Sequence, residues 1–196
     1  MSEITRICLD VDDVCNRFTM PILASLGCPV DPLGYDGFPV ECGYDILAAA
    51  KHYGHEISKT KFWDSITRDV WAGLPESAEF RPLLDHCERL VGLENTYILT
   101  SPTLDPECLA GKLDWIQEHF PRVMQRNFMI GPPKELCARP SHLLIDDRDD
   151  NVDKFRREGG HTILVPRPWN RLHNYATLPY IENALKQKFD HAQASL

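Results

Sequence analysis

The sequence predicts an α/β protein: a mainly parallel sheet with helices on both faces, and a small, mainly helical cap inserted after the first strand. Four short runs rich in aliphatic residues, at 4–10, 96–100, 142–146 and 161–165, have the length and composition of buried strands. Helical patterns separate the later runs, which is typical of parallel strands joined by crossovers. The interval between the first two runs is too long for a simple crossover and therefore predicts an insertion.

The composition is that of a globular protein of one domain with a modest insertion. The chain has 196 residues, of which 43% are hydrophobic and 26% charged. No apolar stretch approaches the length of a membrane span, and the start MSEITR lacks the pattern of a secretory signal, so we expect a cytoplasmic protein without a membrane partner. The net charge of −8 argues against general nucleic-acid binding. It does not exclude a small phosphorylated substrate.

The cysteines indicate a reducing compartment. There are seven of them, an odd number, and no C-x-x-C pair occurs. Several lie among apolar neighbours, as Cys8 does in RICLD. We interpret them as reduced thiols that mostly serve packing.

The strand at 4–10 begins the core, which we expect to comprise residues 1–16 and 93–196, with the cap at 17–92. Within the cap, helical patterns occur around 45–54 and 61–71.

Helices are expected before and between the later strands. One apolar stripe runs from Phe80 to Val91. The next helix starts at Asp105 followed by Pro106, and its expected stripe consists of Leu109, Leu113, Ile116 and Phe120. A short helix follows the third strand and stops at Gly159 and Gly160, and a closing helix runs from about 179 to 189.

Polar side chains follow three of the predicted strands. They are Asp10, Asp12 and Asp13 after the first strand, Thr100 and Ser101 at the end of the second, and Asp146 and Asp147 at the end of the third. In a doubly wound sheet, ligands bind at the carboxyl ends of the strands. These side chains should therefore gather at one edge.

Each acidic motif alone could be a solvated turn, where Asp is common. Three matching strand ends favour a functional interpretation. Carboxylates held close together repel one another, and a hard divalent cation such as Mg²⁺ would relieve that repulsion. We therefore predict a Mg²⁺ site.

The order DVDDV, ILTSP, a lysine and LLIDDRDDN resembles the haloacid dehalogenase (HAD) superfamily of phosphotransferases. Within it, LENTYILTSPT, GKLDWIQEHF and RLHNYATLPYIENAL resemble segments of the 5'(3')-deoxyribonucleotidases, and FWDSITRDVWAGLPESAEF resembles their cap. The resemblance implies a HAD-like, Rossmann-like fold and Mg²⁺-dependent hydrolysis of nucleoside monophosphates. It also implies a homodimer, for which the sequence itself has no signal.

The resemblance assigns Asp10 as the nucleophile that forms an aspartyl phosphate. Asp12 becomes the general acid and base, and its backbone carbonyl a metal ligand. Alternation along an extended strand puts both side chains on one side. Asp146 is the expected metal carboxylate of the last motif, with Asp147 close behind it.

Thr100 and Ser101 are expected to bind phosphate, as is Lys134, the lysine before the third strand, which would also neutralise Asp10. Lys112 aligns with a family lysine near the phosphate, but an exposed helix residue is an equal alternative. The family often has another basic residue just before the lysine, whereas this chain has GPPK at 131–134.

Phe18, Phe38, Trp63 and Trp71 are candidates for contact with a nucleobase, because aromatic rings stack on its flat face. Phe18 lies eight residues after Asp10, where the family has a base-contacting aromatic residue. Ordinary core packing is the alternative for each, and especially for Trp63 and Trp71. Arg148 and Asn151 are interpreted as turn and helix-capping residues.

The segment after the fourth strand, VPRPWNRLH, contains Arg167, Trp169 and Arg171 and has no predicted role.

The function predicted is a Mg²⁺-dependent phosphomonoesterase for (deoxy)ribonucleoside monophosphates. Hydrolysis of another small ester, a sugar phosphate or a nucleic-acid terminal phosphate, is the alternative, because the cap and not the core motifs selects the substrate. A noncatalytic binding module is a further alternative, disfavoured because Asp10 and Asp12 are both present.

Overall fold

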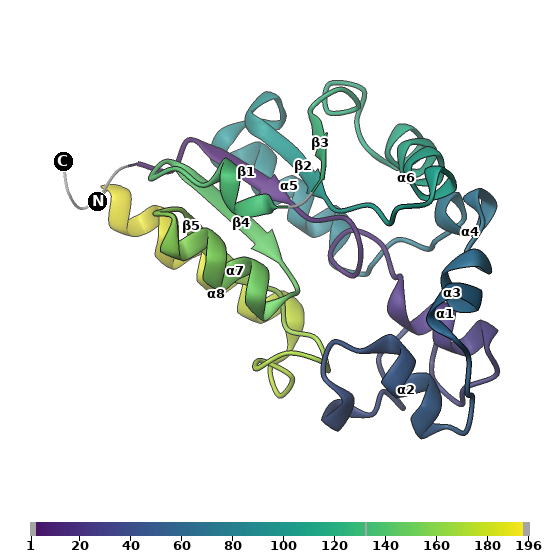
Figure 1. Ribbon diagram of the computed structural model, residues 1–196. Coiled ribbons are helices and arrows are strands. Elements are labelled where there is room, and N and C mark those ends of the chain that lie inside the picture. Colours follow the sequence, from purple (N-terminus) through teal and green to yellow (C-terminus); the bar gives the residue numbers. More distant parts are fainter. Residues whose placement is uncertain (1–2, 132, 194–196) are drawn as a thin grey trace.

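The structure, a computed structural model, describes residues 3–131 and 133–193. Its centre is a five-stranded sheet in the order β3-β2-β1-β4-β5, with all neighbours parallel (Figure 1). The strands are β1 Arg6–Leu9, β2 Thr96–Thr100, β3 Phe128–Ile130, β4 His142–Asp146 and β5 His161–Leu164. This is the predicted fold class. Four strands were predicted, and the edge strand β3 was not.

Strand β1 is the middle of the sheet. Ile7 is in register with Thr96 on one side and with Leu143 on the other. The loop that follows β1 therefore lies between the ends of β2 and β4, which are the strands that carry the other predicted site residues.

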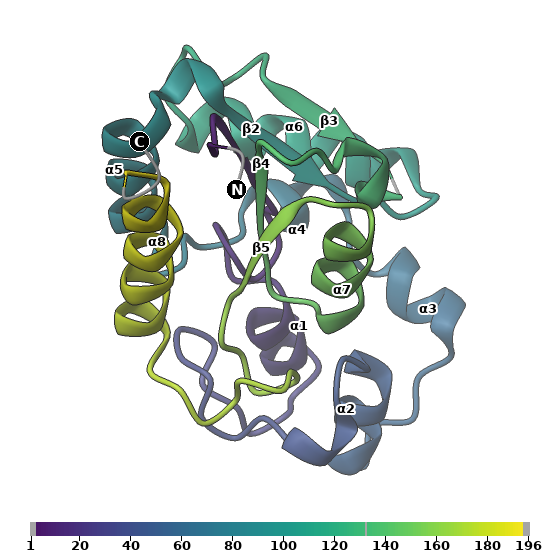
Figure 2. The same cartoon turned by 90° about the vertical axis from the view of Figure 1, so that its left-hand side faces the viewer.

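Helices cover both faces of the sheet. On one face Ile7, Leu9 and Ile98 share a core with α5 (Phe80–Val91), α6 (Pro106–His119) and α8 (Thr177–Gln193). On the other, Cys8 and Leu144 pack with Phe155 of α7 (Asp149–Arg157). Figure 2 shows α5 and α8 on one side of the sheet and α7 on the other.

Helix α6 starts as predicted, and Ile116 and Phe120 of its predicted stripe are buried. The Asp105 side chain accepts a hydrogen bond from the backbone N–H of Glu107 at 2.9 Å, and Pro106 occupies the first turn. Leu109 was expected in the buried stripe but is 41% exposed, whereas Cys108, Lys112 and Trp115 are buried. Lys112 lies on the buried face because this face is directed toward the site described below.

Short helices fill the chain between β1 and α5. They are α1 Thr19–Ser25, the 3₁₀ turn η1 Val40–Cys42, α2 Ile46–His52, α3 Lys59–Asp64 and α4 Arg68–Ala72. They gather at the end of the molecule toward which the strands point (Figure 1). The single helix expected over 61–71 is two helices, because Thr67 is extended, with ψ of 170°, and starts α4.

The division into a core and a cap at 17–92 stays a prediction. Helix α5, which falls inside that range, packs against β1 and β2. Two further 3₁₀ turns, η2 Leu93–Asn95 and η3 Lys134–Cys137, precede β2 and β4.

Across the described residues, no helix combines the length and apolar character needed to cross a membrane. All seven cysteines are free thiols, and five of them are buried, in agreement with the packing role predicted for them.

Candidate active site

Three buried carboxylates meet at the carboxyl edge of the sheet. Asp10 follows β1, Asp146 ends β4, and Asp147 comes next in the chain. One ligand oxygen from each lies within 4.8 Å of the others. Their exposed fractions are 6%, 0% and 1%, respectively. The topology thus brings together acids that are far apart in the sequence.

Lys134 lies between two of these acids. Its Nζ is 2.8 Å from Asp10 Oδ1 and 2.7 Å from Asp146 Oδ2. Burial alone would lower the pKa of Lys134, but the charges of Asp10 and Asp146 outweigh it and raise this pKa above its usual value. The lysine is 3% exposed, so its charge acts within the site and not on the surface. Pro132, part of the GPPK stretch, lies outside the described residues.

Asp146 is also held by the segment that follows it. It accepts hydrogen bonds from the backbone N–H of Arg148 at 2.9 Å and from Asn151 Nδ2 at 3.0 and 3.1 Å. Burial raises the pKa of Asp146, and Lys134 opposes this shift. Asn151 was expected to cap a helix. Here its side chain instead orients a carboxylate of the site.

A second lysine pairs with Asp12. Lys112 Nζ contacts Asp12 Oδ2 and donates hydrogen bonds to Thr100 Oγ1 at 3.0 Å and to the Ser101 carbonyl at 3.1 Å. Asn16 Nδ2 donates to the other oxygen of Asp12 at 3.2 Å. Lys112 is 1% exposed, so the alternative of an exposed helix lysine is wrong.

Asp13 makes the turn that separates these acids from α1. Its φ of 57° is left-handed, a conformation uncommon for residues other than glycine. Its carboxylate accepts from the backbone N–H of Phe18 and Thr19 and from Thr19 Oγ1 at 2.6 Å. Burial raises the pKa of Asp13 to about 6, although these bonds oppose the shift.

Asp147 has a partner that the sequence did not reveal. Trp169 Nε1 donates to Asp147 Oδ2 at 2.6 Å, and Asn170 Nδ2 donates to the Asp147 carbonyl at 2.7 Å. Burial and the neighbouring acids Asp146, Asp13 and Asp10 raise the pKa of Asp147 well above its usual range. Asp147 and Trp169 are 22 positions apart, with α7 and β5 between them, so no periodic sequence pattern connects the two side chains.

Asp10 and Asp12 open into a pocket of about 920 Å³. The residues that line it include Asp10, Asp12, Phe18, Trp71, Ser101 and Lys134. The Phe18 ring is parallel to those of Trp71 and Trp63, with ring centres 4.7 and 6.3 Å away. Phe18 and Trp71 therefore lie in the pocket as well as in the core, while Phe38 lies elsewhere.

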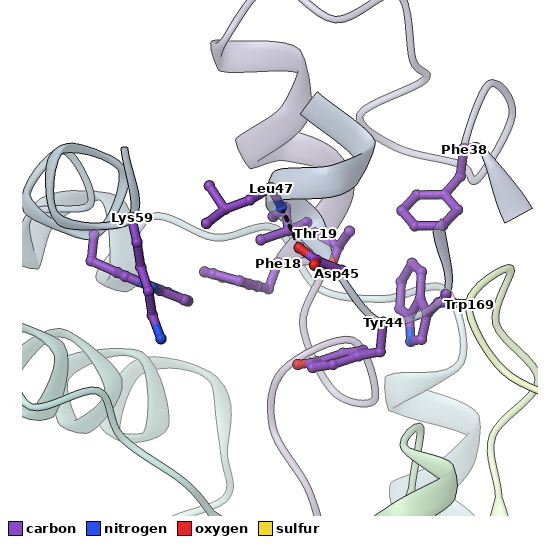
Figure 3. A pocket seen from close by; sticks show the side chains of 11 residues that line it. Phe18, Thr19, Phe38, Tyr44, Asp45, Leu47, Lys59 and Trp169 are labelled. Atoms are coloured by element: carbon purple, nitrogen blue, oxygen red, sulfur yellow. Dashed lines mark hydrogen bonds between the residues drawn. The ribbon is translucent and has the colours of Figure 1, made fainter. Parts of the chain in front are cut away.

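Phe38 belongs to a smaller, mainly apolar cavity of about 280 Å³ next to this pocket. Phe18, Tyr44, Lys59 and Trp63 line both. In Figure 3, Phe38, Tyr44 and Trp169 stand together on one side of this cavity and Lys59 on the other.

The acidic group fits a hard divalent cation. All its ligands are carboxylate oxygens, which is the donor type that Mg²⁺ prefers. In the described part of the chain, Lys134 pairs with Asp10 and Asp146 but not with Asp147. A second positive charge would favour the ionised form of all three acids, and Mg²⁺ is a suitable source of it.

A parallel sheet of this order, with inserted helices after β1, has the HAD-like fold. Two solved structures share its fold. One is a HAD-family hydrolase from Deinococcus radiodurans R1 with bound phosphate and sodium, with a TM-score of 0.56, 14% identity and coverage of 96% of this chain and 97% of that one. The other is a hydrolase from Streptococcus pneumoniae TIGR4, with a TM-score of 0.55, 10% identity and coverage of 94% and 100%.

The chain belongs to the family described as 5' nucleotidase, deoxy (Pyrimidine), cytosolic type C, which residues 63–178 match. It is also 32% identical over 78 residues to the 5'(3')-deoxyribonucleotidases of Bacillus subtilis (strain 168) and of Bacillus phage SPbeta. Each of these alignments covers 40% of this chain and 42% of the relative's length.

Proposed function

We propose that this protein is a Mg²⁺-dependent phosphomonoesterase that hydrolyses deoxyribonucleoside monophosphates. The observation that carries the proposal is the buried group of Asp10, Asp146 and Asp147 beside a pocket large enough for a nucleotide. Membership of a nucleotidase family and the names of the Bacillus relatives support the choice of substrate.

Asp10 is the proposed nucleophile. The backbone N–H of Val11 and the Lys134 ammonium both contact its Oδ1, at 2.8 Å each. We therefore assign Oδ2 to the attack on phosphorus, which forms the aspartyl phosphate and breaks the bond to the nucleoside oxygen. Lys134 would reduce repulsion between Asp10 and the incoming phosphate dianion.

Asp12 is the proposed general acid and base. It would protonate the departing nucleoside oxygen, then take a proton from the water that attacks the aspartyl phosphate and releases inorganic phosphate. Ser101 lines the pocket, so its hydroxyl would contact a bound phosphate. Lys112 is buried next to it, between Asp12 and Thr100, and its ammonium would add positive charge close to that phosphate.

Asp10, Asp146 and the carbonyl of Asp12 would hold the Mg²⁺ ion, with Asp147 beside them. The ion, when bound, supplies positive charge against the phosphate oxygens as charge builds up in the transition state.

The nucleoside would occupy the aromatic side of the pocket. Phe18 and Trp71 present parallel ring planes there, and Phe38 lines the adjoining cavity. Stacking on such rings accepts any base, so these residues account for binding a nucleoside rather than for selecting one base.

Phosphate release from dUMP and dTMP, measured with and without Mg²⁺, tests the proposal. We expect release that needs the ion and disappears in Asp10→Asn, while Asp85→Asn, which changes an exposed carboxylate on α5, keeps it. Sugar phosphates measured in parallel address the alternative substrate class. Turnover of these alone, with none of any nucleotide, would contradict the nucleotide assignment.

A further inference from the structure

The segment after β5, to which the sequence assigned no role, contacts the carboxylate group and the aromatic cavity at once. We propose that Trp169 is a positioning residue: its indole N–H fixes Asp147 for the cation, while its ring forms a wall of the nucleoside side of the site. This inference rests on the metal site of the proposed function. It adds a residue outside the acidic motifs on which the cation would depend.

The first contact is with the acid. Trp169 Nε1 donates to Asp147 Oδ2 at 2.6 Å, and the two side chains are 5% and 1% exposed, so water does not compete for this bond. With Oδ2 engaged, Oδ1 remains for a cation. Partners of this kind orient metal-binding carboxylates, and their loss weakens metal binding.

The loop that carries Trp169 is itself fixed. Asn170 Nδ2 donates to the carbonyls of Asp147 at 2.7 Å and of Val165 at 2.8 Å. The guanidinium of Arg167, which is 1% exposed, donates from Nε to the carbonyl of Asp13 at 2.7 Å and pairs with Glu79. The loop thus contacts both the turn after Asp12, through Arg167, and Asp147, through Trp169 and Asn170.

The second contact is with the cavity. The Trp169 ring meets Phe38 and Tyr44 edge-on, with ring centres 5.1 and 6.3 Å apart, and Figure 3 shows these three side chains forming one side of the cavity. Trp169 and Phe38 belong to a hydrophobic cluster that also includes Met20 and Leu23 of α1. The Trp169 side chain therefore contacts both the carboxylate group and the helices inserted after β1.

The two contacts can be separated by substitution. Trp169→Phe removes the N–H and keeps an aromatic ring, whereas Phe38→Leu alters the cavity and leaves the N–H bond in place. Trp115→Phe is the matched control, because it also removes a buried indole N–H bond, to the Leu74 carbonyl at 2.7 Å, but away from the acids.

The measurement is binding of Mn²⁺, a substitute for Mg²⁺, to the full chain without nucleotide, with free ion quantified by electron paramagnetic resonance. We expect Mn²⁺ to bind Trp169→Phe about 10- to 100-fold more weakly than wild type. Phe38→Leu and Trp115→Phe should bind it as wild type does. In turnover, Phe38→Leu should raise KM for dUMP without changing the Mg²⁺ requirement.

Wild-type Mn²⁺ affinity in Trp169→Phe, or an equal loss in Trp115→Phe, would overturn the inference and leave the proposed function standing. Wild-type protein that binds no Mn²⁺ would remove the metal site and the inference together. If Trp169→Phe does not fold, 3-benzothienylalanine at position 169 keeps the shape of the indole without its N–H and permits the same comparison.

Discussion

At the scale of single residues, Lys134 offsets the negative charge of two buried carboxylates. It is buried between Asp10 and Asp146, with Asp147 close by. Removing one partner from a buried ion pair leaves a charge without compensation, and this costs more than the pair itself contributes. The stability of the fold and the charge balance of the site therefore depend on the same ammonium.

We predict that Lys134→Met lowers the free energy of unfolding by about 3 kcal/mol when no divalent ion is present, because the buried Asp10 and Asp146 carboxylates lose the Lys134 ammonium that neutralises them. Excess Mg²⁺ should restore part of this loss by binding the same acids. Urea unfolding followed by circular dichroism, with and without Mg²⁺, measures both effects.

Lys59→Met is the control, because Lys59 lines the same pocket but is exposed. It should unfold as wild type does. A Lys134→Met variant as stable as wild type in the absence of the ion would show that the buried acids are protonated and need no cation.

At the scale of elements, α4 and α6 approach each other closely at Gly111. A Cβ added at Gly111 of α6 would lie 2.4 Å from Trp71 Cβ and 2.6 Å from the Arg68 carbonyl oxygen, both in α4. Only glycine lets the two backbones come this close. This contact also places Trp71, and with it the Phe18 ring, in the pocket.

Gly111→Ala should lower the free energy of unfolding by about 2 kcal/mol, because overpacking against backbone atoms outweighs the gain in helix propensity. KM for the nucleotide should rise as Trp71 shifts. Urea unfolding and steady-state kinetics test the two effects separately. A variant more stable than wild type would show that α4 can move away from α6 at no cost.

The segment that leaves β1 and the segment that enters α5 meet in a single antiparallel bridge between Asn16 and Glu76. The Glu76 carboxylate joins α5 to α6, since it pairs with Arg81 and with His119 Nδ1, the latter at 2.8 Å. Burial would raise the pKa of Glu76, but hydrogen bonds from Arg81 and His119 outweigh it and hold this pKa below its usual value.

A carboxyl whose pKa is lowered in the folded state stabilises the fold above its unfolded pKa, and this contribution is lost as the pH falls through the folded pKa. Glu76→Gln should therefore cost about 1 kcal/mol at neutral pH, a modest value because the site is partly exposed. The difference from wild type should vanish at strongly acidic pH. Unfolding curves across this range check it, with Glu118→Gln, at an exposed carboxylate, as the control.

Across the whole molecule, the cysteines report how tightly the two faces of the sheet are covered. Cys8, Cys15, Cys28, Cys87 and Cys108 are buried, and Cys42 and Cys137 are partly exposed. Burial raises the pKa of the Cys8 and Cys87 thiols to about 12. The thiolate is the reactive form, so burial suppresses reaction both sterically and chemically.

We predict that a thiol reagent such as Ellman's labels Cys42 and Cys137 rapidly in the native protein and all seven cysteines only in urea. Cys42→Ser and Cys137→Ser should each remove one fast equivalent. Rapid labelling of Cys8 would mean that the face under α7 opens readily.

The sequence allowed most of the fold to be predicted, because buried parallel strands are continuous apolar runs. It did not reveal β3, where only Phe128, Met129 and Ile130 pair, at the edge and partly exposed. Nor did it reveal the break at Thr67, whose extended backbone separates α3 from α4.

The acids of the candidate site could be predicted because each follows a strand, and parallel strands end at one edge. The contacts of Trp169 and Asn151 could not, because a hydrogen bond between a loop or helix side chain and a carboxylate has no sequence period. Their geometry exists only once the loops are folded.

The central position of β1 also bears on how the protein forms during synthesis. Both edges of β1 are paired only after β2, with Thr96, and then β4, with Leu143, have been synthesised. Such distant pairings are slow to form and leave a strand with open edges meanwhile. On the ribosome, the edge of the sheet that carries the candidate site would thus be completed late, and a nascent chain that ends before His142 would leave one edge of β1 unpaired and open to aggregation.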